Sequence, residues 1–199
     1  MNKKIPITAA ELAAELHSDP RWVALKQNRD REFADRVTKL REEQAPLMEE
    51  LASVGVFYHS LGEMLNSPGP YRDAIPVLLD HLEKPYSDPT REAIARCLAV
   101  PDACYAWVKL KDLYRKERTP LKDTGGRVKD GLAVAVAATT TEENIEELVA
   151  LARDRSLGDS RVLLLRRLKR SKMLSQCALQ ELASDPDLKK EIASWNRRP

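Results

Sequence analysis

The chain has 199 residues, of which 32% are charged and 5% aromatic, and its formal net charge is +2. This mixture favours amphipathic helices over sheets, and so small a net charge does not demand a nucleic-acid partner. No window approaches the roughly 18 uninterrupted apolar residues of a membrane span, and no apolar stretch of a signal peptide follows the first two lysines. We therefore expect an all-α, cytoplasmic protein that does not enter a membrane.

The first predicted element is a short helix over residues 9–17. Thr8 and Glu11 have the spacing of a capping box, in which each side chain accepts a hydrogen bond from the other residue's backbone N–H group. A second helix is expected to start at Asp19-Pro20, because Asp accepts hydrogen bonds from first-turn N–H groups and Pro needs no donor there.

A long amphipathic helix is predicted from about Asn28. Pro46 is expected to kink or divide this helix, and Gly55 to end it. Ser60 then begins another capping-box pattern before a short helix. The apolar positions that define the long helix are Phe33, Val37, Leu40, Leu47, Met48 and Leu51.

The clearest boundary in the sequence is the Ser-Pro-Gly-Pro stretch at 67–70. It separates a predicted N-terminal helical layer, residues 1–66, from a predicted array of about four helical pairs over residues 71–195. Three Ser-Asp-Pro sequences are expected to mark helix starts, and two of them, at 87–89 and 184–186, lie within the array. Helix starts that recur every 30 to 45 residues or so are typical of stacked helical hairpins.

The second helices of the first three pairs can be aligned by superposing Ile94, Leu132 and Leu164. A basic residue then falls at one shared position in each helix: Arg91, Lys129 and Arg161. This pattern resembles the HEAT repeat, specifically the short HEAT-like repeats of bacterial armadillo-type solenoids. The resemblance covers about residues 71–195 and implies a right-handed α-solenoid, although the second pair departs from it by a long polar turn near 119–126.

Patterns that carry catalysis or metal binding are not found in the sequence. None of the three histidines has a second His or Cys three or four residues away, which a metal site on one helix requires. His81 is expected to be a surface or semi-buried packing residue. The three cysteines, Cys97, Cys104 and Cys177, form no C-x-x-C pair and are expected to be buried small residues in a reducing compartment.

A turn at 123–129 places two glycines before basic residues, an arrangement that can bind phosphate at a helix start. It lacks the P-loop order, so an ordinary turn is the preferred interpretation. No nucleophile-elbow sequence occurs. We therefore expect no enzymatic activity, no metal and no cofactor.

The strongest charge feature is the segment 155–172, where seven basic residues accompany the single acid Asp159. In a HEAT-like stack the second helices line the concave surface, so their outward positions would contact a partner. The residues at these positions, our candidate partner-binding residues, are Glu92, Arg96, Asp130, Arg166 and Arg170. An ordinary solvated surface is the alternative interpretation.

The preferred hypothesis is a protein-binding solenoid whose partner is another protein. One form of this hypothesis is an immunity protein that inhibits a toxin. The alternative is nucleic-acid binding through the basic groove, for which the HEAT-like DNA glycosylases are the family precedent. Trp107 and Trp195 are better interpreted as packing aromatics than as glycosylase residues. The sequence leaves the oligomeric state open.

Overall fold

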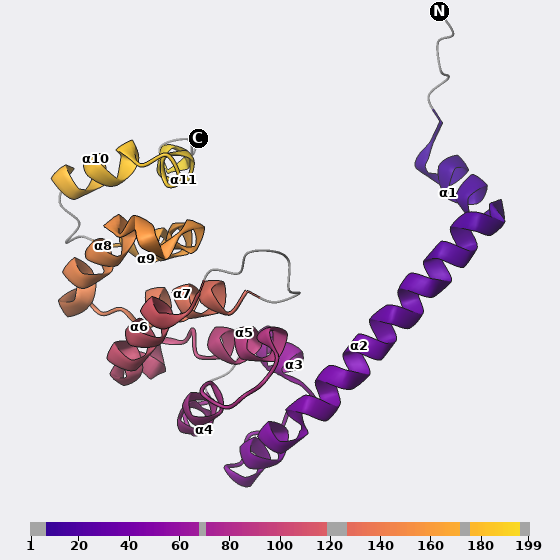
Figure 1. Ribbon diagram of the computed structural model, residues 1–199, viewed down its shortest axis with the longest axis horizontal. Helices are drawn as coiled ribbons and strands as arrows, with labels where there is room; N and C mark the ends of the chain where they lie inside the picture. The colour runs from indigo at the N-terminus through magenta and orange to yellow at the C-terminus, as the bar shows by residue number, and fades with distance from the viewer. Residues whose placement is uncertain (1–6, 68–70, 119–126, 172–175, 196–199) are drawn as a thin grey trace, which may run out of the picture. The chain divides into compact units, whose positions relative to one another are not determined.

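The computed structural model describes residues 7–67, 71–118, 127–171 and 176–195 (Figure 1). Every regular element within these ranges is a helix, which confirms the all-α prediction. None of the helices in the described ranges combines the length and the apolar composition that crossing a membrane requires.

The first compact unit comprises residues 1–43, and its first helix is α1 (Ala9–Ser18). The predicted capping box is present: Glu11 N donates to Thr8 Oγ1 at 3.3 Å, and Thr8 N donates to Glu11 Oε2 at 2.8 Å. Helix α2 (Pro20–Ser53) starts where Asp19 accepts a hydrogen bond from the backbone N–H of Arg21. None of residues 7–43 is buried.

Helix α2 is one continuous helix that begins in the first unit and ends in the second, which comprises residues 44–199. Pro46 does not divide it, and the kink that the sequence offered as the alternative stays a prediction. A proline removes only one helical donor, and Leu47 and Leu51 on the same helix are fully buried, which holds the segment in place. Gly55 ends the helix as predicted, with φ of +81°.

The rest of the second unit is a series of short helices. Helices α3 to α7 are Leu61–Asn66, Ala74–His81, Asp88–Cys97, Trp107–Lys116 and Val128–Thr139. Helices α8 to α11 are Ile145–Arg153, Leu165–Leu168, Gln176–Ser184 and Lys189–Ser194. Short 3₁₀ helices lie between some of them, notably η1 (Pro101–Ala106) before α6 and η4 (Asp159–Leu164) before α9. The predicted boundary at 67–70 falls mostly outside the described residues and stays a prediction.

Helix α7 lies at the centre of the second unit, between α5, α6 and η4 (Figure 1). Consecutive helices also pack on one another in the expected pairs: α4 with α5, α6 with α7, α8 with η4 and α9, and α10 with α11. Leu132 and Leu164, which the sequence placed on apolar faces, are buried in one continuous core, whereas Phe33 of the predicted long helix is exposed. Burial of these aliphatic faces is the main stabilising contribution.

The three Ser-Asp-Pro sequences differ in their structural roles. The first starts α2 as predicted. In the second, Ser87 is the N-cap residue and Asp88 already belongs to α5. The third opens a turn, and α11 starts three residues after Pro186 at Lys189. There Asp185 Oδ1 accepts a hydrogen bond from the Asp187 N–H group at 2.9 Å, so it caps the turn that leads into the helix.

Two of the three register-equivalent basic residues, Arg91 and Arg161, pair with acids of the following helical pair, and Lys129 contacts the first helix of its own pair. Arg91 pairs at 2.7 Å with Glu117, the residue that ends α6. Lys129 is buried, with its ammonium 5.6 Å from the centre of the Tyr114 ring. Arg161 is 0% exposed and pairs with Asp185 at 3.0 Å and with Asp187 at 2.8 Å. The aligned positions therefore join neighbouring helices instead of facing solvent.

Helices α5 and α7 approach so closely at Gly131 that a side chain has no room there. A Cβ atom at this position would lie 2.8 Å from the backbone oxygen of Glu92 and 3.1 Å from Cβ of Ala95. We therefore expect Gly131→Ala to destabilise the protein by roughly 1–3 kcal/mol, because the two helices must separate. Urea unfolding measures this change.

The matched control is Gly62→Ala in α3, where the added Cβ would lie 3.7 Å from Ser60 Oγ, an ordinary contact. Alanine is the better helix former, so this variant should be neutral or slightly more stable. An equal loss of stability in the two variants would contradict the close approach of α5 and α7.

Candidate functional site

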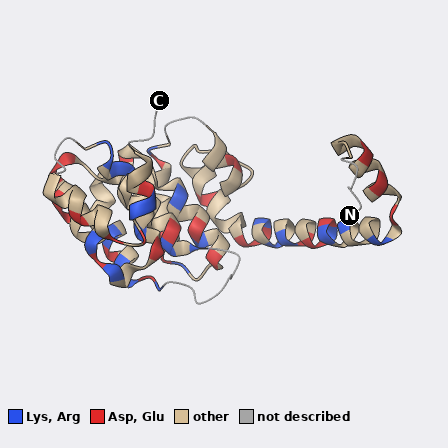
Figure 2. Cartoon of the chain, turned by 90° about the horizontal axis from the view of Figure 1, so that it is seen from above, with Lys and Arg blue, Asp and Glu red and all other residues tan. Residues whose placement is uncertain are grey.

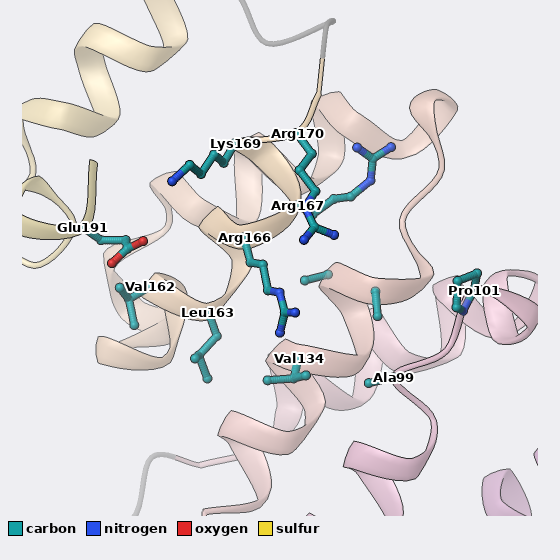
Figure 3. A pocket seen from close by; sticks show the side chains of 12 residues that line it. Ala99, Pro101, Val134, Val162, Leu163, Arg166, Arg167, Lys169, Arg170 and Glu191 are labelled. Atoms are coloured by element: carbon teal, nitrogen blue, oxygen red, sulfur yellow. The ribbon is translucent and has the colours of Figure 1, made fainter. Parts of the chain in front are cut away.

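An open pocket of about 990 Å³ lies over α7 and is walled by η4, α9 and the start of η1 (Figure 3). Twelve residues from these elements and from α11 line it: Ala99, Pro101, Val134, Ala137, Ala138, Val162, Leu163, Arg166, Arg167, Lys169, Arg170 and Glu191. Its floor is apolar and its rim is basic. We call it the Arg166 pocket.

The floor is built from small aliphatic side chains on one side of α7. Val134, Ala137 and Ala138 recur at i, i+3 and i+4, which places them on one helix face. Leu163 of η4 continues this surface. Because alanine side chains are short, the helix backbone lies close to the base of the pocket, and larger side chains of a ligand have room above it.

Arg166 and Arg170 form the basic rim. Both side chains are exposed, and neither forms a hydrogen bond or an ion pair with any residue in the described ranges. The intervening Lys169 keeps helical backbone angles, φ −55° and ψ −30°, so the four-residue spacing places both arginines on one side of the chain. In Figure 3 the guanidinium group of Arg166 extends over the floor toward Val134.

The neighbouring cations are engaged within the fold. Arg167 donates to the backbone oxygen of Thr140 at 2.9 Å and to Glu142 at 2.7 Å. The ammonium group of Lys169 lies 5.7 Å from the centre of the Trp195 ring. Arg166 and Arg170 are therefore the arginines of the rim whose hydrogen-bond donors have no acceptor within the described part of the chain.

The other three candidate residues belong to a separate ion-pair cluster, which joins α5, α7 and η4. Arg96 pairs with Glu92 at 2.7 Å, and Glu92 also accepts a hydrogen bond from the backbone N–H of Arg127. The Arg127 side chain pairs with Asp130 at 3.1 Å and with Asp159 at 2.8 Å. Burial raises the pKa of Asp130, while Arg127 opposes this shift. These pairs connect helices of the fold, and the structure does not bring them into the Arg166 pocket.

Basic residues elsewhere on the surface alternate with acidic ones. Figure 2 shows Lys and Arg interspersed with Asp and Glu along α2. The basic segment 155–172 is less uniform than its sequence indicates, since Arg161 is buried and Arg167 is paired. Its last residue, Lys172, lies outside the described residues, as does most of the glycine-containing turn at 123–129.

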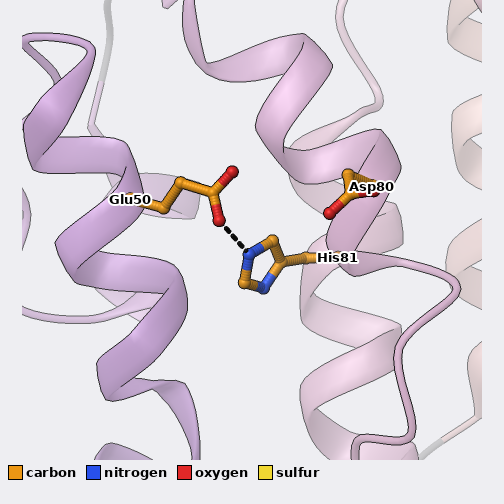
Figure 4. A group of neighbouring side chains, drawn as sticks. All are labelled: Glu50, Asp80 and His81. Atoms are coloured by element: carbon orange, nitrogen blue, oxygen red, sulfur yellow. Dashed lines mark hydrogen bonds and ion pairs between the residues drawn. The ribbon is translucent and has the colours of Figure 1, made fainter.

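His81 is a buried residue with two polar partners, so the prediction of a surface or semi-buried position is wrong. Its Nε2 atom lies 2.8 Å from the carboxylate of Glu50 on α2 (Figure 4). Its Nδ1 atom lies 2.8 Å from the Tyr86 hydroxyl. Both partners are distant in sequence or beyond the helix end, which conceals them from a search by helical spacing. The hydrogen bond from His81 lowers the pKa of the Glu50 carboxyl.

Glu50, Asp80 and His81 place three potential metal ligands within 4.8 Å of one another. The Lys84 ammonium, however, lies 2.8 Å from Asp80 and 3.7 Å from Glu50. A cationic side chain thus already neutralises the two carboxylates, and His81 Nε2 is hydrogen-bonded to one of them. This set of side chains fits a partly exposed ion-pair cluster better than a metal site.

The cysteines differ from one another. Cys97 is buried as predicted, and burial raises the pKa of its thiol to about 12, which keeps it protonated. Cys104 and Cys177 are exposed, so the prediction of burial is wrong for these two. Trp107 is buried and donates its indole N–H to Thr140 Oγ1 at 2.8 Å, which agrees with the expectation that it is a packing residue.

The sequence identified the rim of the pocket but missed its floor. Ala137 and Ala138 looked like ordinary helix residues, and Ala99, Pro101 and Glu191 belong to segments far from α9 in the chain. The one local signal was the run of small residues along the Val134 side of α7.

Comparison with known proteins found no match: no family model, no curated protein and no solved structure is significantly similar to this chain.

Proposed function

We propose that this chain is a non-enzymatic, protein-binding α-solenoid of HEAT-like helical pairs. The observation that carries the proposal is the Arg166 pocket, which combines an apolar floor with two arginines that have no partner within the described residues. Protein interfaces commonly have an apolar centre with arginine among the enriched residues.

The solenoid part of the proposal is supported by the way the helices pack. Second helices α5 and α7 lie side by side, and η4 follows on the other side of α7. The aligned residues Arg91 and Arg161 each pair with an acid just past the end of the first helix of the next pair. A shared contact at a shared position is expected of structural repeats.

Within this class, we propose an inhibitor or immunity-type role, in which the pocket contacts an acidic surface of one partner protein, such as a toxin. Complementary charge would accelerate association and select the partner. Along α2, by contrast, basic residues are interspersed with acidic ones (Figure 2).

Nucleic-acid binding, including a glycosylase role, is the second candidate, because free arginines also contact phosphates. The lining of the pocket argues against it: none of the twelve lining residues is aromatic, whereas proteins that hold unpaired bases stack them on aromatic rings. The aromatic ring of Trp107 could stack on a base only if it were exposed, but it is buried and hydrogen-bonded within the fold.

Affinity capture of the tagged chain from its native cells, with and without nuclease, tests the proposal. We expect one nuclease-resistant protein that is recovered with the wild type and lost from the Arg166→Glu/Arg170→Glu variant. The exposed pair Arg115 and Lys116 on α6 supplies the control, since Arg115→Glu/Lys116→Glu changes the net charge equally but lies outside the pocket.

Both double variants should keep the melting temperature of the wild type within a few degrees, because all four side chains are exposed. If the captured material is lost after nuclease treatment, the result would favour nucleic-acid binding, the second candidate function. A protein partner that is lost equally from both double variants would show attraction to net charge without a specific site.

A further inference from the structure

The chemistry of the Arg166 pocket restricts which part of a partner protein it accepts. Arg166 lies in α9 and Arg170 two residues past its end, and neither has a partner within the described residues. Because Lys169 between them keeps helical backbone angles, we expect the separation of neighbouring positions on a helix, about 6 Å between Cβ atoms. Two carboxylates with the same four-residue spacing on a partner helix have a matching separation. Arginine pairs with carboxylates through two parallel hydrogen bonds, which is stronger than a contact between point charges.

The apolar floor sets a second requirement. Seven of the twelve lining residues are Ala, Val, Leu or Pro, and the floor residues Val134, Ala137 and Ala138 follow one side of α7. Binding is favourable when aliphatic side chains of a ligand cover this surface, because apolar area is then removed from water. A uniformly charged ligand would bury little apolar area there. The pocket volume of about 990 Å³ is of the order that several such side chains fill.

We propose that the Arg166 pocket binds a helix of the partner protein that presents aliphatic side chains on one face, flanked by carboxylates four residues apart. The aliphatic side chains contact Val134, Ala138 and Leu163, and the carboxylates pair with Arg166 and Arg170. This is recognition of an amphipathic helix in a groove. The inference rests on the proposed function, since it specifies the partner of the same site.

Defined peptides test the inference without knowledge of the natural partner. The probe is a fluorescein-labelled helical peptide of about 15 residues, with Leu at i, i+3, i+4 and i+7 and Glu at a flanking i, i+4 pair. One matched peptide replaces Glu with Gln, and another replaces Leu with Ser. Fluorescence anisotropy with the full chain measures each dissociation constant.

The wild type is expected to bind the Leu/Glu peptide about tenfold more tightly than either matched peptide. Arg166→Ala/Arg170→Ala should remove the preference for Glu over Gln, whereas Arg115→Ala/Lys116→Ala should retain it. Val134→Asp places a carboxylate in the floor, and of the variants it should weaken binding of the Leu/Glu peptide most. Val134 is only partly buried, and urea unfolding of each variant confirms that it is folded.

Equal affinity for the Glu and Gln peptides, undetectable binding of all three, or a preference that survives in Arg166→Ala/Arg170→Ala would overturn the inference. Displacement of the peptide by a single-stranded oligonucleotide at comparable concentration would do so as well, in favour of nucleic acid. These failures are distinct from failure of the proposed function. If a protein is captured from cells through Arg166 and Arg170 but none of the peptides binds, the proposed protein-binding function is supported. The inference that the pocket binds an amphipathic helix is then contradicted.

Discussion

Replacing Leu132 with Asp is expected to abolish the cooperative unfolding transition of the second unit at 25 °C. Leu132 is 1% exposed and lies on α7, which contacts α5, α6 and η4, so the carboxylate would be placed at the centre of the core. An unpaired carboxylate in apolar surroundings costs several kcal/mol, and the lost leucine contacts add about 3 kcal/mol. The sum approaches the whole stability of an ordinary domain.

Circular dichroism during thermal and urea unfolding measures this effect. Leu132→Ala isolates the packing contribution and should cost about 3 kcal/mol while preserving a cooperative transition. Leu65→Asp in α3 is the matched control, because Leu65 is 39% exposed and an aspartate there remains hydrated. Similar losses in Leu132→Asp and Leu65→Asp would mean that α7 is not the central helix of the core.

Asp185→Asn is expected to cost about 3 kcal/mol, because it leaves the fully buried Arg161 without its buried counter-charge. The Arg161 guanidinium group still donates hydrogen bonds to Asp187 and to the backbone oxygen of Ala152, so it keeps some of its partners in this variant. The matched control is Asp80→Asn, whose carboxylate is exposed and pairs with the half-exposed Lys84. An ion pair between such hydrated side chains contributes little to stability, so this variant should unfold much like the wild type.

The same aspartate gives the protein a specific acid response. The hydrogen bond from Arg161 lowers the pKa of Asp185 from 3.8 to about 2. A carboxyl whose pKa is lower in the folded state stabilises that state above the unfolded pKa and loses this contribution as the pH falls toward the folded pKa. The full contribution is about 2 kcal/mol, and about 1 kcal/mol of it is lost between pH 6 and pH 3.

Urea unfolding of the wild type and of Asp185→Asn at pH 6 and pH 3 measures this contribution. The difference in unfolding free energy between the two proteins should shrink by about 1 kcal/mol at the lower pH. A difference that does not change with pH would show that Asp185 titrates normally and that its contact with Arg161 is weaker than its geometry indicates.

The features that sequence predicts well here are those decided by neighbours in the chain. The capping box at Thr8, the helix end at Gly55 and the buried position of Leu132 each follow from residues within one or two helical turns. Local backbone preferences and helical periodicity suffice for them.

The features that were missed depend on residues far apart in the chain. Arg161 and Arg166 look equivalent in the sequence, yet one is buried against Asp185, 24 positions away, and the other is exposed. His81 likewise owes its burial to Glu50, 31 positions earlier. A charged residue is buried only where its partner is delivered by tertiary packing, and periodicity contains no information about that partner.

The candidate site shows the same division. Its arginines were identified as outward positions of a predicted second helix, but three of the five candidate residues chosen in this way proved to be paired among themselves or with Arg127. A solvated charge and a charge within an ion-pair cluster have the same sequence pattern. The apolar floor distinguishes the Arg166 pocket from an ordinary basic surface. It forms only where α7, η4 and η1 pack together in the fold, and the sequence does not show this packing.

The continuity of α2 has a consequence for hydrogen exchange. Residues 20–53 form a single helix about 50 Å long, but its buried side chains are confined to Gln44, Leu47 and Leu51 near the C-terminal end. Amide protons near Leu47 should therefore exchange only when the core opens, whereas those near Arg29 exchange through local fraying. One uninterrupted helix would thus span a wide range of exchange rates, with protection rising steadily along its length toward the core.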